Sequence, residues 1–462
     1  MKLPCACLLF LITCCCAFTA ELQVDFQRTN GSFRAFHGVN KGPLAPGGLL
    51  DLTAAYKELG IPYVRLHDCH WPNPDVVDIH TVFPNPSAVP ERPENYDFAL
   101  TDEYIAAVRQ TGAQLVYRLG ESIEHNKHKR FVFAPKDTEK WAAICLGIIR
   151  HYNDGWASGF HYQIPYWEIW NEPENRPAMW NGSDEDYLRL YRTASRKIKA
   201  AFPILKIGGP AVGYSGAFKA GRFQTSDFVK SFLASCKKEG LPLDFFSWHC
   251  YSANPAELVE RSIAIRALLD ANGFVKTESH LNEWNYLPGN SWKPVSKSAA
   301  PEFRENNYRE MAGPAGATFI SCALLELQDA PVDICNLFHG EAGGFGLFSE
   351  NGVPQPNYYA LLAFHDLLQL PQRAWTSGGT RGALDIAAAR DDQRAGILIS
   401  NYAQSESNID LVLKGCSYPC RYELRRISKA SPKPSVENGI LTGPLHLEIK
   451  KPQVAFILID LK

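Results

Sequence analysis

The sequence YWEIWNEP at residues 166–173 is a short, largely apolar run that ends with a glutamate, Glu172, between Asn and Pro. A second run, HLNEWN at residues 280–285, places Glu283 in a similar setting. Both runs have the length and the aromatic and aliphatic content of buried strands. The two glutamates lie 111 positions apart (283 − 172), which corresponds to three strand–helix repeats of about 37 residues. This spacing predicts that both glutamates end strands of one repeating α/β fold.

Short apolar runs alternate with longer segments of helical spacing between about residues 33 and 368. The predicted strands cover residues 33–39, 63–67, 114–119, 166–170, 206–209, 245–249, 279–284 and 334–339. The predicted helices cover residues 101–111, 138–151, 184–201, 226–238, 256–271, 314–327 and 357–370. Eight strands in this alternation predict an α/β fold, a (β/α)8 TIM barrel, with Glu172 and Glu283 on its fourth and seventh strands. A doubly wound sheet is disfavoured because no GxGxxG turn follows the first strand.

The alternation ends near residue 379, where predicted strands follow one another without helices. These strands cover residues 382–390, 395–399, 409–414, 420–427 and 454–459. They predict a small accessory antiparallel β-sandwich domain. Residues 21–27 alternate in the same way and are expected to join it. The predicted division is therefore residues 1–20 as a signal peptide, 21–32 as a strand of the sandwich, 33–372 as the barrel and 373–462 as the sandwich.

The first 20 residues have the pattern of a secretory signal. Lys2 is their only charge, an apolar run follows at residues 8–12, and small residues precede polar sequence from Glu21 onward. We expect cleavage after Ala20, with Ala17 as the alternative, and a secreted protein in the periplasm or outside the cell. A lipoprotein modified at Cys14 is a weaker alternative. The apolar run is too short to span a bilayer, so no membrane contact is expected of the mature form.

Composition excludes several classes of protein. The chain has 462 residues, of which 45% are hydrophobic and 12% aromatic, so it is not a disordered chain. A formal net charge of −2 provides no basic field for nucleic acid, and none is expected as a partner. Eight of the 13 cysteines follow the signal. Only Cys416 and Cys420 are spaced as a disulfide across a turn, and the others lie in apolar runs typical of buried thiols.

A pair of carboxyls at the mouth of a barrel suits the hydrolysis of glycosidic bonds. The leaving oxygen of a sugar needs a proton donor, and the oxocarbenium-like transition state needs a nearby anion or nucleophile. Two carboxyls in different environments supply both roles. The tryptophans beside Glu172 and Glu283 are expected to stack on a sugar. The alternative is that Glu172 caps the following segment and Glu283 is a surface acid, which is harder to reconcile with two matching strand ends.

The runs around Glu172 and Glu283 resemble those of clan A of the glycoside hydrolases, and the chain as a whole resembles glycoside hydrolase family 39. That family contains β-xylosidases and α-L-iduronidases. Further stretches carry the resemblance: IPYVRLH (61–67), DFFSWHCY (244–251), FHG (338–340), GGFGL (343–347) and PNYYA (356–360). The match covers most of residues 30–370 in the order of the family. It implies a barrel with a small β-sandwich beside it.

The resemblance implies roles for individual residues. Glu172 would be the general acid/base and Glu283 the nucleophile of a retaining double-displacement reaction. Asn171 would bind the sugar 2-hydroxyl. Tyr251 would donate a hydrogen bond to Glu283, and Arg65 would keep Glu283 ionised, since a cation within about 4–6 Å lowers a carboxyl pKa. The alternative for Arg65 is a salt bridge that serves stability alone.

Four further residues are implied as substrate contacts or supports. His67 and His249 would line the pocket of the terminal sugar, although a structural role is open for each. Trp284 follows the proposed nucleophile directly, and Glu341 follows the eighth predicted strand. Both are expected to contact the substrate or support the residues that do.

Together, the signal pattern and the resemblance predict a secreted, exo-acting glycosidase similar to β-xylosidases, with a carbohydrate as its substrate. The eighth predicted strand, ICNLF at residues 334–338, lacks the tryptophan that xylosidases of the family often have. Arabinose, galactose and uronic acid therefore stay open as the sugar, and endo action stays open as the mode. A different class is also open, a noncatalytic carbohydrate-binding protein on a barrel scaffold. The sequence does not indicate the oligomeric state.

No cofactor is expected, and no metal. His67, Asp68 and His70 offer ligand atoms, but strand spacing puts His67 and Asp68 on opposite faces. The pair His125 and His128 is flanked by basic residues, which repel a cation. Serine chemistry is not expected, because no GxSxG motif occurs.

Overall fold

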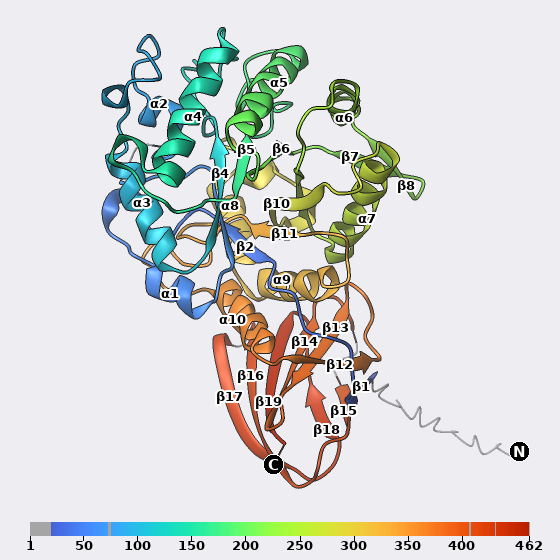
Figure 1. Cartoon of the computed structure of the whole chain (residues 1–462). Coiled ribbons are helices and arrows are strands. Elements are labelled where there is room, and N and C mark those ends of the chain that lie inside the picture. Colours follow the sequence, from blue (N-terminus) through green and yellow to red (C-terminus); the bar gives the residue numbers. More distant parts are fainter. Residues whose placement is uncertain (1–19, 73–74, 406–407, 430, 462) are drawn as a thin grey trace, which may run out of the picture.

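The computed structural model describes residues 20–72, 75–405, 408–429 and 431–461. Apart from Ala20, the predicted signal peptide lies outside the described residues. Figure 1 shows a barrel surrounded by helices, with a separate sheet packed below it. Within the described ranges, no helix has both the length and the hydropathy needed to cross a bilayer.

The barrel is closed by eight strands that pair in parallel. They are β2 (His37–Asn40), β3 (Tyr63–Leu66), β4 (Gln114–Leu119), β5 (Tyr166–Ile169), β6 (Lys206–Val212), β9 (Phe245–Ser252), β10 (Glu278–Tyr286) and β11 (Ile334–Leu337). The predicted barrel is confirmed, and each predicted strand overlaps one of these strands. β9 and β10 extend further at their carboxyl ends than predicted, which carries Tyr251 and Asn285 into the sheet.

Helices surround the barrel in the order of a (β/α)8 fold. They are α1 (Thr53–Glu58), α2 (Ile79–Val82), α3 (Ala99–Gln110), α4 (Thr138–Asp154), α5 (Asp184–Ala201), α6 (Asp227–Glu239), α7 (Pro255–Ala271), α8 (Pro301–Met311), α9 (Pro314–Leu327) and α10 (Pro356–Leu368). Helix α5 begins at a capping box, in which Ser183 and Asp186 bond each other's backbone N–H. The sequence did not predict α1, α2 or α8, because α1 and α2 are short and α8 is mostly polar.

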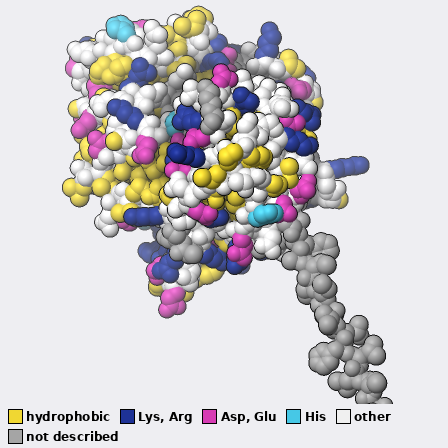
Figure 2. Space-filling model, turned by 90° about the horizontal axis from the view of Figure 1, so that it is seen from below, with side chains coloured by type: hydrophobic (Ala, Val, Ile, Leu, Met, Phe, Trp, Pro, Cys, Tyr) yellow, Lys and Arg dark blue, Asp and Glu magenta, His cyan; other side chains and the backbone are white. Residues whose placement is uncertain are grey.

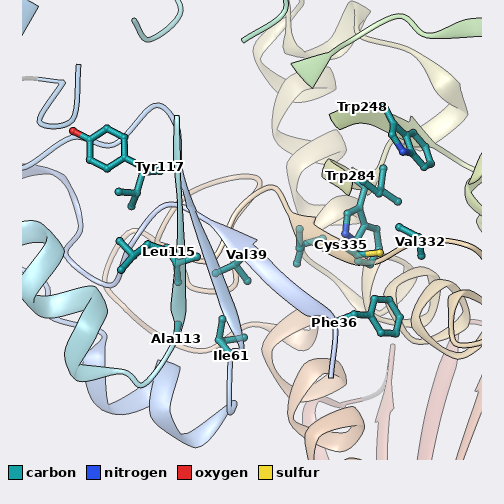
Figure 3. Packing of buried hydrophobic residues seen from close by; sticks show 14 of the residues in the cluster. Phe36, Val39, Ile61, Ala113, Leu115, Tyr117, Trp248, Trp284, Val332 and Cys335 are labelled. Carbon is teal, nitrogen blue, oxygen red and sulfur yellow. The ribbon is translucent and has the colours of Figure 1, made fainter. Parts of the chain in front are cut away.

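The largest hydrophobic core lies between the barrel strands and the helices. Figure 3 shows part of it, where Trp248 of β9 and Trp284 of β10 lie near Val332 and Cys335. These side chains point away from the barrel axis because successive residues of a strand face opposite sides. The strand residues on either side of each tryptophan are thereby turned toward the barrel interior.

The second domain is a nine-stranded sheet around a core of its own. Its strands are β1 (Ala20–Thr29), β12 (Gln372–Ser377), β13 (Leu384–Arg390), β14 (Arg394–Asn401), β15 (Asn408–Lys414), β16 (Cys420–Ser428), β17 (Ser431–Leu441), β18 (Leu445–Glu448) and β19 (Gln453–Asp460). The sheet is mostly antiparallel, but β1 pairs in parallel with β15. Helices α9 and α10 lie between this sheet and the barrel (Figure 1).

Two further features bear on the sequence predictions. A hairpin that the sequence did not predict, β7 (Gly216–Lys219) and β8 (Arg222–Thr225), lies between β6 and α6. The sulfur atoms of Cys416 and Cys420 lie 3.4 Å apart as free thiols, so the suggested disulfide is not formed here. On the face shown in Figure 2, acidic and basic side chains are interspersed with hydrophobic ones.

Candidate active site

A pocket of about 780 Å³ opens at the carboxyl ends of the barrel strands. This is the end at which TIM-barrel enzymes carry their active sites. Its lining includes Asn171, Glu172, His67, His249, Tyr251 and Glu283, together with Asp68, Ile123, His125, Glu174, Asn175, Met179, Gly213, Tyr214, Gly216, Ala217, Cys250, Glu257, Arg261, Trp292, Val295, Phe338 and Phe345. Both glutamates of the matching strand ends thus face one pocket.

The strand ends around this pocket depart from regular backbone geometry. Five residues that are not glycine have positive φ angles there: Lys41 (66°), Asp68 (51°), Trp170 (70°), Glu172 (43°) and Ala211 (53°). Such conformations cost about 1–3 kcal/mol each and cluster at functional sites. The backbone N–H of Glu172 donates to the carbonyl of Ala211, 3.0 Å away. The positive φ angles change the direction of the side chains that follow each strand, and Glu172 faces the pocket as a result.

The guanidinium of Arg65 on β3 organises the base of the pocket. Its Nη1 donates to Glu283 Oε1 at 2.8 Å, and its Nε donates to Glu168 Oε2 at 2.7 Å. Nη2 donates to Asn171 Oδ1 at 2.7 Å. Arg65 and Glu168 are fully buried, so the guanidinium and both carboxylates form one charge-paired network. Because the oxygen of Asn171 is committed to Arg65, its Nδ2 is the atom left to donate toward a ligand.

Glu283 lies at the end of the regular part of β10, between two donors. Tyr251 Oη donates to its Oε2 at 2.9 Å, opposite the bond from Arg65. Burial raises the pKa of Glu283 above its usual value, and this outweighs the lowering by His249 and Arg65. Arg65 thus lowers the pKa of Glu283, as expected from the sequence, but burial outweighs this effect and the net shift is upward.

His249 links the two glutamates. Its Nδ1 lies 2.8 Å from Glu172 Oε1 and 3.5 Å from Glu283 Oε2. Burial disfavours the charged imidazole, but the carboxylates of Glu283 and Glu172 raise the pKa of His249 above its usual value. Burial likewise raises the pKa of Glu172, yet the bonds from His249 and from Asn175 Nδ2 lower it overall. These shifts favour the proton on His249, from which Glu172 Oε1 can take it across the hydrogen bond.

His67 approaches Glu283 from β3. Its Nε2 lies 3.7 Å from Glu283 Oε1 and 3.4 Å from Asp68 Oδ1. Burial and the charges of Arg65 and Arg118 hold its pKa well below the usual value, so the ring is neutral. Because Nδ1 accepts from Arg118 Nε, the proton is assigned to Nε2, which faces the carboxylates.

Three residues predicted from the sequence do not line the pocket: Arg65, which is buried beneath it, Trp284 and Glu341. Trp284 is fully buried against Phe319, on the face of β10 opposite Glu283. Glu341 is buried in an ion pair, with its Oε1 2.7 Å from Lys41 Nζ. Both can support the site but do not reach its surface.

The tryptophans of the two strand ends are core residues. Trp167, Trp170 and Trp284 have no exposed surface, so the prediction that they stack on a sugar is wrong. Trp292, which follows β10, lines the pocket instead and is 50% exposed. Its ring lies 4.9 Å from that of Tyr251. The sequence offers no strand pattern around Trp292 that would have identified it.

Sequence reasoning also missed Glu168, Asn282 and Asn175. Glu168 accepts from Arg65 and from Asn282 Nδ2, which lies 2.6 Å away. Strand alternation was the available signal, because Glu168 follows the outward-facing Trp167 and must point inward. The contact of Asn175 with Glu172 lies in a turn and has no such signal.

Two groups in the described part of the chain are close enough to hold a cation: Asp78, His80 and Glu121, and Glu172, His249 and Glu283. Each adjoins a buried guanidinium, Arg118 or Arg65, which already supplies positive charge to the carboxylates.

The sequence predicted that His67 and Asp68 lie on opposite faces of a strand. In the structure, both side chains line the pocket instead. The reason is that β3 ends at Leu66 and Asp68 has a positive φ angle.

Comparison with known proteins is consistent with this site. Residues 49–398 match the family model described as glycosyl hydrolases family 39. A β-xylosidase of Caldicellulosiruptor saccharolyticus is 25% identical over 457 residues, covering 87% of this chain and 85% of the relative. A β-xylosidase of Geobacillus stearothermophilus is 26% identical over 259 residues. That match covers 51% of this chain and 48% of the relative, so the chain spans about half of that relative's length.

Solved structures share the whole fold. A glucosidase from Croceicoccus marinus aligns with a TM-score of 0.77 at 22% identity, covering 96% of this chain and 99% of that one. The GH39 enzyme from Xanthomonas axonopodis pv. citri aligns with a TM-score of 0.71 at 17% identity, covering 98% and 100%. At these identities the likeness concerns the barrel and its accessory sheet.

Proposed function

Because the chain belongs to the glycosyl hydrolases family 39, it is a glycosidase, and we propose that it is a retaining, exo-acting enzyme similar to β-xylosidases. Glu172 is the general acid/base of this proposal and Glu283 the nucleophile. The observation that carries it is the approach of the two carboxylates across His249. Oxygen atoms of Glu172 and Glu283 lie within 4.8 Å of each other.

This separation supports retention of configuration. Retaining glycosidases hold their carboxyls about 5–5.5 Å apart, whereas inverting enzymes leave about 6.5–9.5 Å for a water molecule. In the first step, Glu283 attacks the anomeric carbon while Glu172 gives its proton to the leaving oxygen. In the second step, Glu172 takes a proton from water, the resulting hydroxide attacks the anomeric carbon, and the bond to Glu283 breaks.

The neighbours of the pair fit these steps. The Glu172–His249 pair stores the proton that the leaving oxygen needs. Arg65 and Tyr251 bind both oxygens of Glu283, which orients the carboxylate for attack. When Glu283 becomes an ester its charge disappears, and His249 loses one of the two carboxylates that favour its protonation. Asn171 Nδ2 is available for the sugar 2-hydroxyl, as the family resemblance implies.

The lining favours a neutral sugar such as xylose over a uronic acid. It contains five carboxyls, those of Asp68, Glu172, Glu174, Glu257 and Glu283. Against them stands one guanidinium within the described lining, Arg261, which donates to Glu257 Oε1 at 2.6 Å. A sugar carboxylate would thus enter a negative environment. Exo action rests on the similarity to β-xylosidases.

The experiment that tests the proposal is hydrolysis of a panel of aryl glycosides, with the anomeric configuration of the first product followed by proton NMR. We expect release of the sugar from one aryl β-glycoside with a β-configured first product. Glu172→Gln and Glu283→Gln should lose that activity. An α-configured first product would contradict retention, and activity that survives in Glu283→Gln would contradict the nucleophile. Binding of glycans with no hydrolysis would favour a carbohydrate-binding protein.

We further propose that the protein is secreted after cleavage of residues 1–20. The proposal rests on the short apolar run behind Lys2 and on the small residues before Glu21. Expression of the full chain with the first 20 residues present or deleted, followed by N-terminal sequencing of exported material, tests it. An exported chain should begin at Glu21, and retention of Met1 would contradict cleavage.

A further inference from the structure

The pocket does not end at Glu172. A second hollow of about 560 Å³ adjoins it, and Glu174, Tyr214 and Ala217 line both. The second hollow is otherwise lined by the hairpin β7–β8 and the start of α6, through Lys219, Gln224, Thr225, Ser226, Asp227, Phe228 and Lys230. We call this hollow the hairpin groove. Figure 1 shows β7 and β8 at the right side of the barrel, beside α6 and α7.

We propose that the hairpin groove binds the leaving-group portion of a neutral glycan chain, beyond the sugar that is released. This inference rests on the proposed function, because it takes Glu172 as the proton donor to the leaving oxygen. The leaving group must then extend from the Glu172 side of the pocket. Glu174 is two positions from Glu172, and its Oε1 accepts from the backbone N–H of Tyr214 at 2.8 Å. A leaving group that extends from Glu172 therefore passes Glu174 and Tyr214 before it enters the hairpin groove.

Glu174 has an unused acceptor at this junction. Its Oε2 is buried and has no hydrogen-bond partner among the described residues. Burial and the nearby charge of Glu172 raise the pKa of Glu174 to about 7. A buried polar atom without a partner costs free energy, and a sugar hydroxyl would supply the missing donor. Glu174 therefore suits a hydroxyl-bearing ligand better than an apolar one.

Tyr214 offers a ring to the same ligand. It is 58% exposed, and it lies where the pocket and the groove meet. An exposed aromatic ring with a polar tip is suited to a sugar, which has an apolar face and polar edges. The groove lining beyond it contains two acidic residues, Glu174 and Asp227, and two lysines, Lys219 and Lys230. This balance favours a neutral chain over a polyanion.

The wall of the groove is held in place before a ligand arrives. Arg261 of α7 donates from Nη1 to the carbonyl of Gly216 at 2.8 Å and to Ser215 Oγ at 3.1 Å. Its guanidinium lies 5.9 Å and 5.5 Å from the ring centroids of Phe218 and Phe223, one on each strand of the hairpin. Fixing a binding surface beforehand reduces the entropy lost on binding.

The test compares leaving groups of different length on one released sugar. The substrates are the glycosyl fluoride, whose leaving group is a single atom, and the di-, tri- and tetrasaccharides of the same sugar. The proteins are the wild type, Tyr214→Ala, Tyr214→Phe and Arg222→Ala. Tyr214 is exposed, so its replacement should leave the fold intact. Arg222 is an exposed residue of the same hairpin that lines neither hollow, which makes it the matched control.

We expect kcat/KM of the wild type to rise about tenfold from the disaccharide to the trisaccharide, as about 1.4 kcal/mol of added contact would produce. Tyr214→Ala should lose most of this rise, so its loss of kcat/KM on the trisaccharide should exceed its loss on the fluoride by about tenfold. Tyr214→Phe and Arg222→Ala should behave as the wild type. Equal kcat/KM for all oligosaccharides would contradict binding in the hairpin groove but not the proposed function. An equal loss on the fluoride and the oligosaccharides in Tyr214→Ala would do the same. No hydrolysis of any substrate overturns the proposed function and the groove with it.

Discussion

Two clusters near the mouth of the barrel contain the same kinds of group. Glu172, His249 and Glu283 adjoin the buried Arg65, and Asp78, His80 and Glu121 adjoin the buried Arg118. In each cluster a histidine bonds a glutamate, at 2.8 Å for His249 and at 2.5 Å for His80. In each, burial raises the pKa of one glutamate, Glu283 or Glu121.

The clusters differ in access. The ring of His80 is stacked at 3.6 Å on Phe131, and Asp78 accepts from Arg118 and from both the N–H and the hydroxyl of Ser122. The cluster of Asp78, His80 and Glu121 does not line the pocket, whereas that of Glu172, His249 and Glu283 does. Perturbed pKa values thus occur both in the enclosed cluster of Asp78, His80 and Glu121 and in the cluster that lines the pocket. Access to an open pocket distinguishes them.

The largest effect should come from the proposed nucleophile. Glu283→Gln keeps the size of the side chain but removes the nucleophile, so kcat should fall on the order of 10⁴-fold. Glu121→Gln, the matched change in the other cluster, should leave kcat within about threefold. Steady-state rates on the best aryl glycoside measure both. A comparable loss in the two variants would remove the functional distinction between the clusters.

The next effect depends on the leaving group. Glu172→Gln removes the proton donor, which should lower kcat by about 10²–10⁴-fold on substrates with poor leaving groups. A dinitrophenyl glycoside needs little protonation, so its first step should lose far less. The burst of released phenol, followed by stopped flow, separates that step from hydrolysis of the intermediate. If all leaving groups lost rate equally, Glu172 would not be the acid.

A smaller effect concerns the pH profile. Activity needs Glu283 ionised, so it rises through a pKa above 4.5, and it needs the proton of the Glu172–His249 pair, so it falls through a pKa above 6.5. In His249→Asn, Glu283 loses a neighbouring cation and its pKa rises further. The proton must then rest on Glu172 alone, so the alkaline limb moves to lower pH. The active range should narrow from both sides.

The profile of kcat/KM against pH, measured on one aryl glycoside, checks this expectation. His80→Asn is the control from the other cluster and should keep both limbs of the wild-type profile. A His249→Asn profile with unchanged limbs would show that His249 positions Glu172 without holding its proton.

The sequence predicted the fold well because strand ends and helix starts are local signals. The predicted strand at residues 114–119 coincides with β4, and the predicted helix at residues 184–201 coincides with α5 and its capping box. The hairpin β7–β8 was missed because each strand has four residues. Its two-residue turn, Ala220 and Gly221, has positive φ angles at both positions, as a type I′ turn requires. The available signal was the turn itself, flanked by two phenylalanines, Phe218 and Phe223, that pair across the hairpin.

The site was predictable only in part. Glu172 and Glu283 follow from matching strand ends, and both line the pocket. Trp284 was misjudged because alternation turns it outward when Glu283 points inward. The hydrogen bond between Glu172 and His249 joins residues 77 positions apart, and their distance follows from packing rather than from local sequence. The same holds for the junction of Glu174 and Tyr214, 40 positions apart.

The smallest effect should be on stability in the closed cluster. Burial, with the charge of Asp78, raises the folded-state pKa of Glu121 to about 7 from 4.5, against the bond from His80. A raised pKa contributes stability that is complete below pH 4.5 and is lost as the pH rises through about 7. The pKa of His80 is also raised, so its contribution to stability is likewise lost as the pH rises.

The Tm of the wild type should therefore fall between pH 5 and pH 8, and in Glu121→Gln that fall should be smaller by about 2–4 °C. Thermal unfolding by circular dichroism at both pH values measures this. Parallel curves for the wild type and Glu121→Gln would mean that Glu121 keeps the same charge in the folded and unfolded chains, and the likeness between the two clusters would then be one of composition alone.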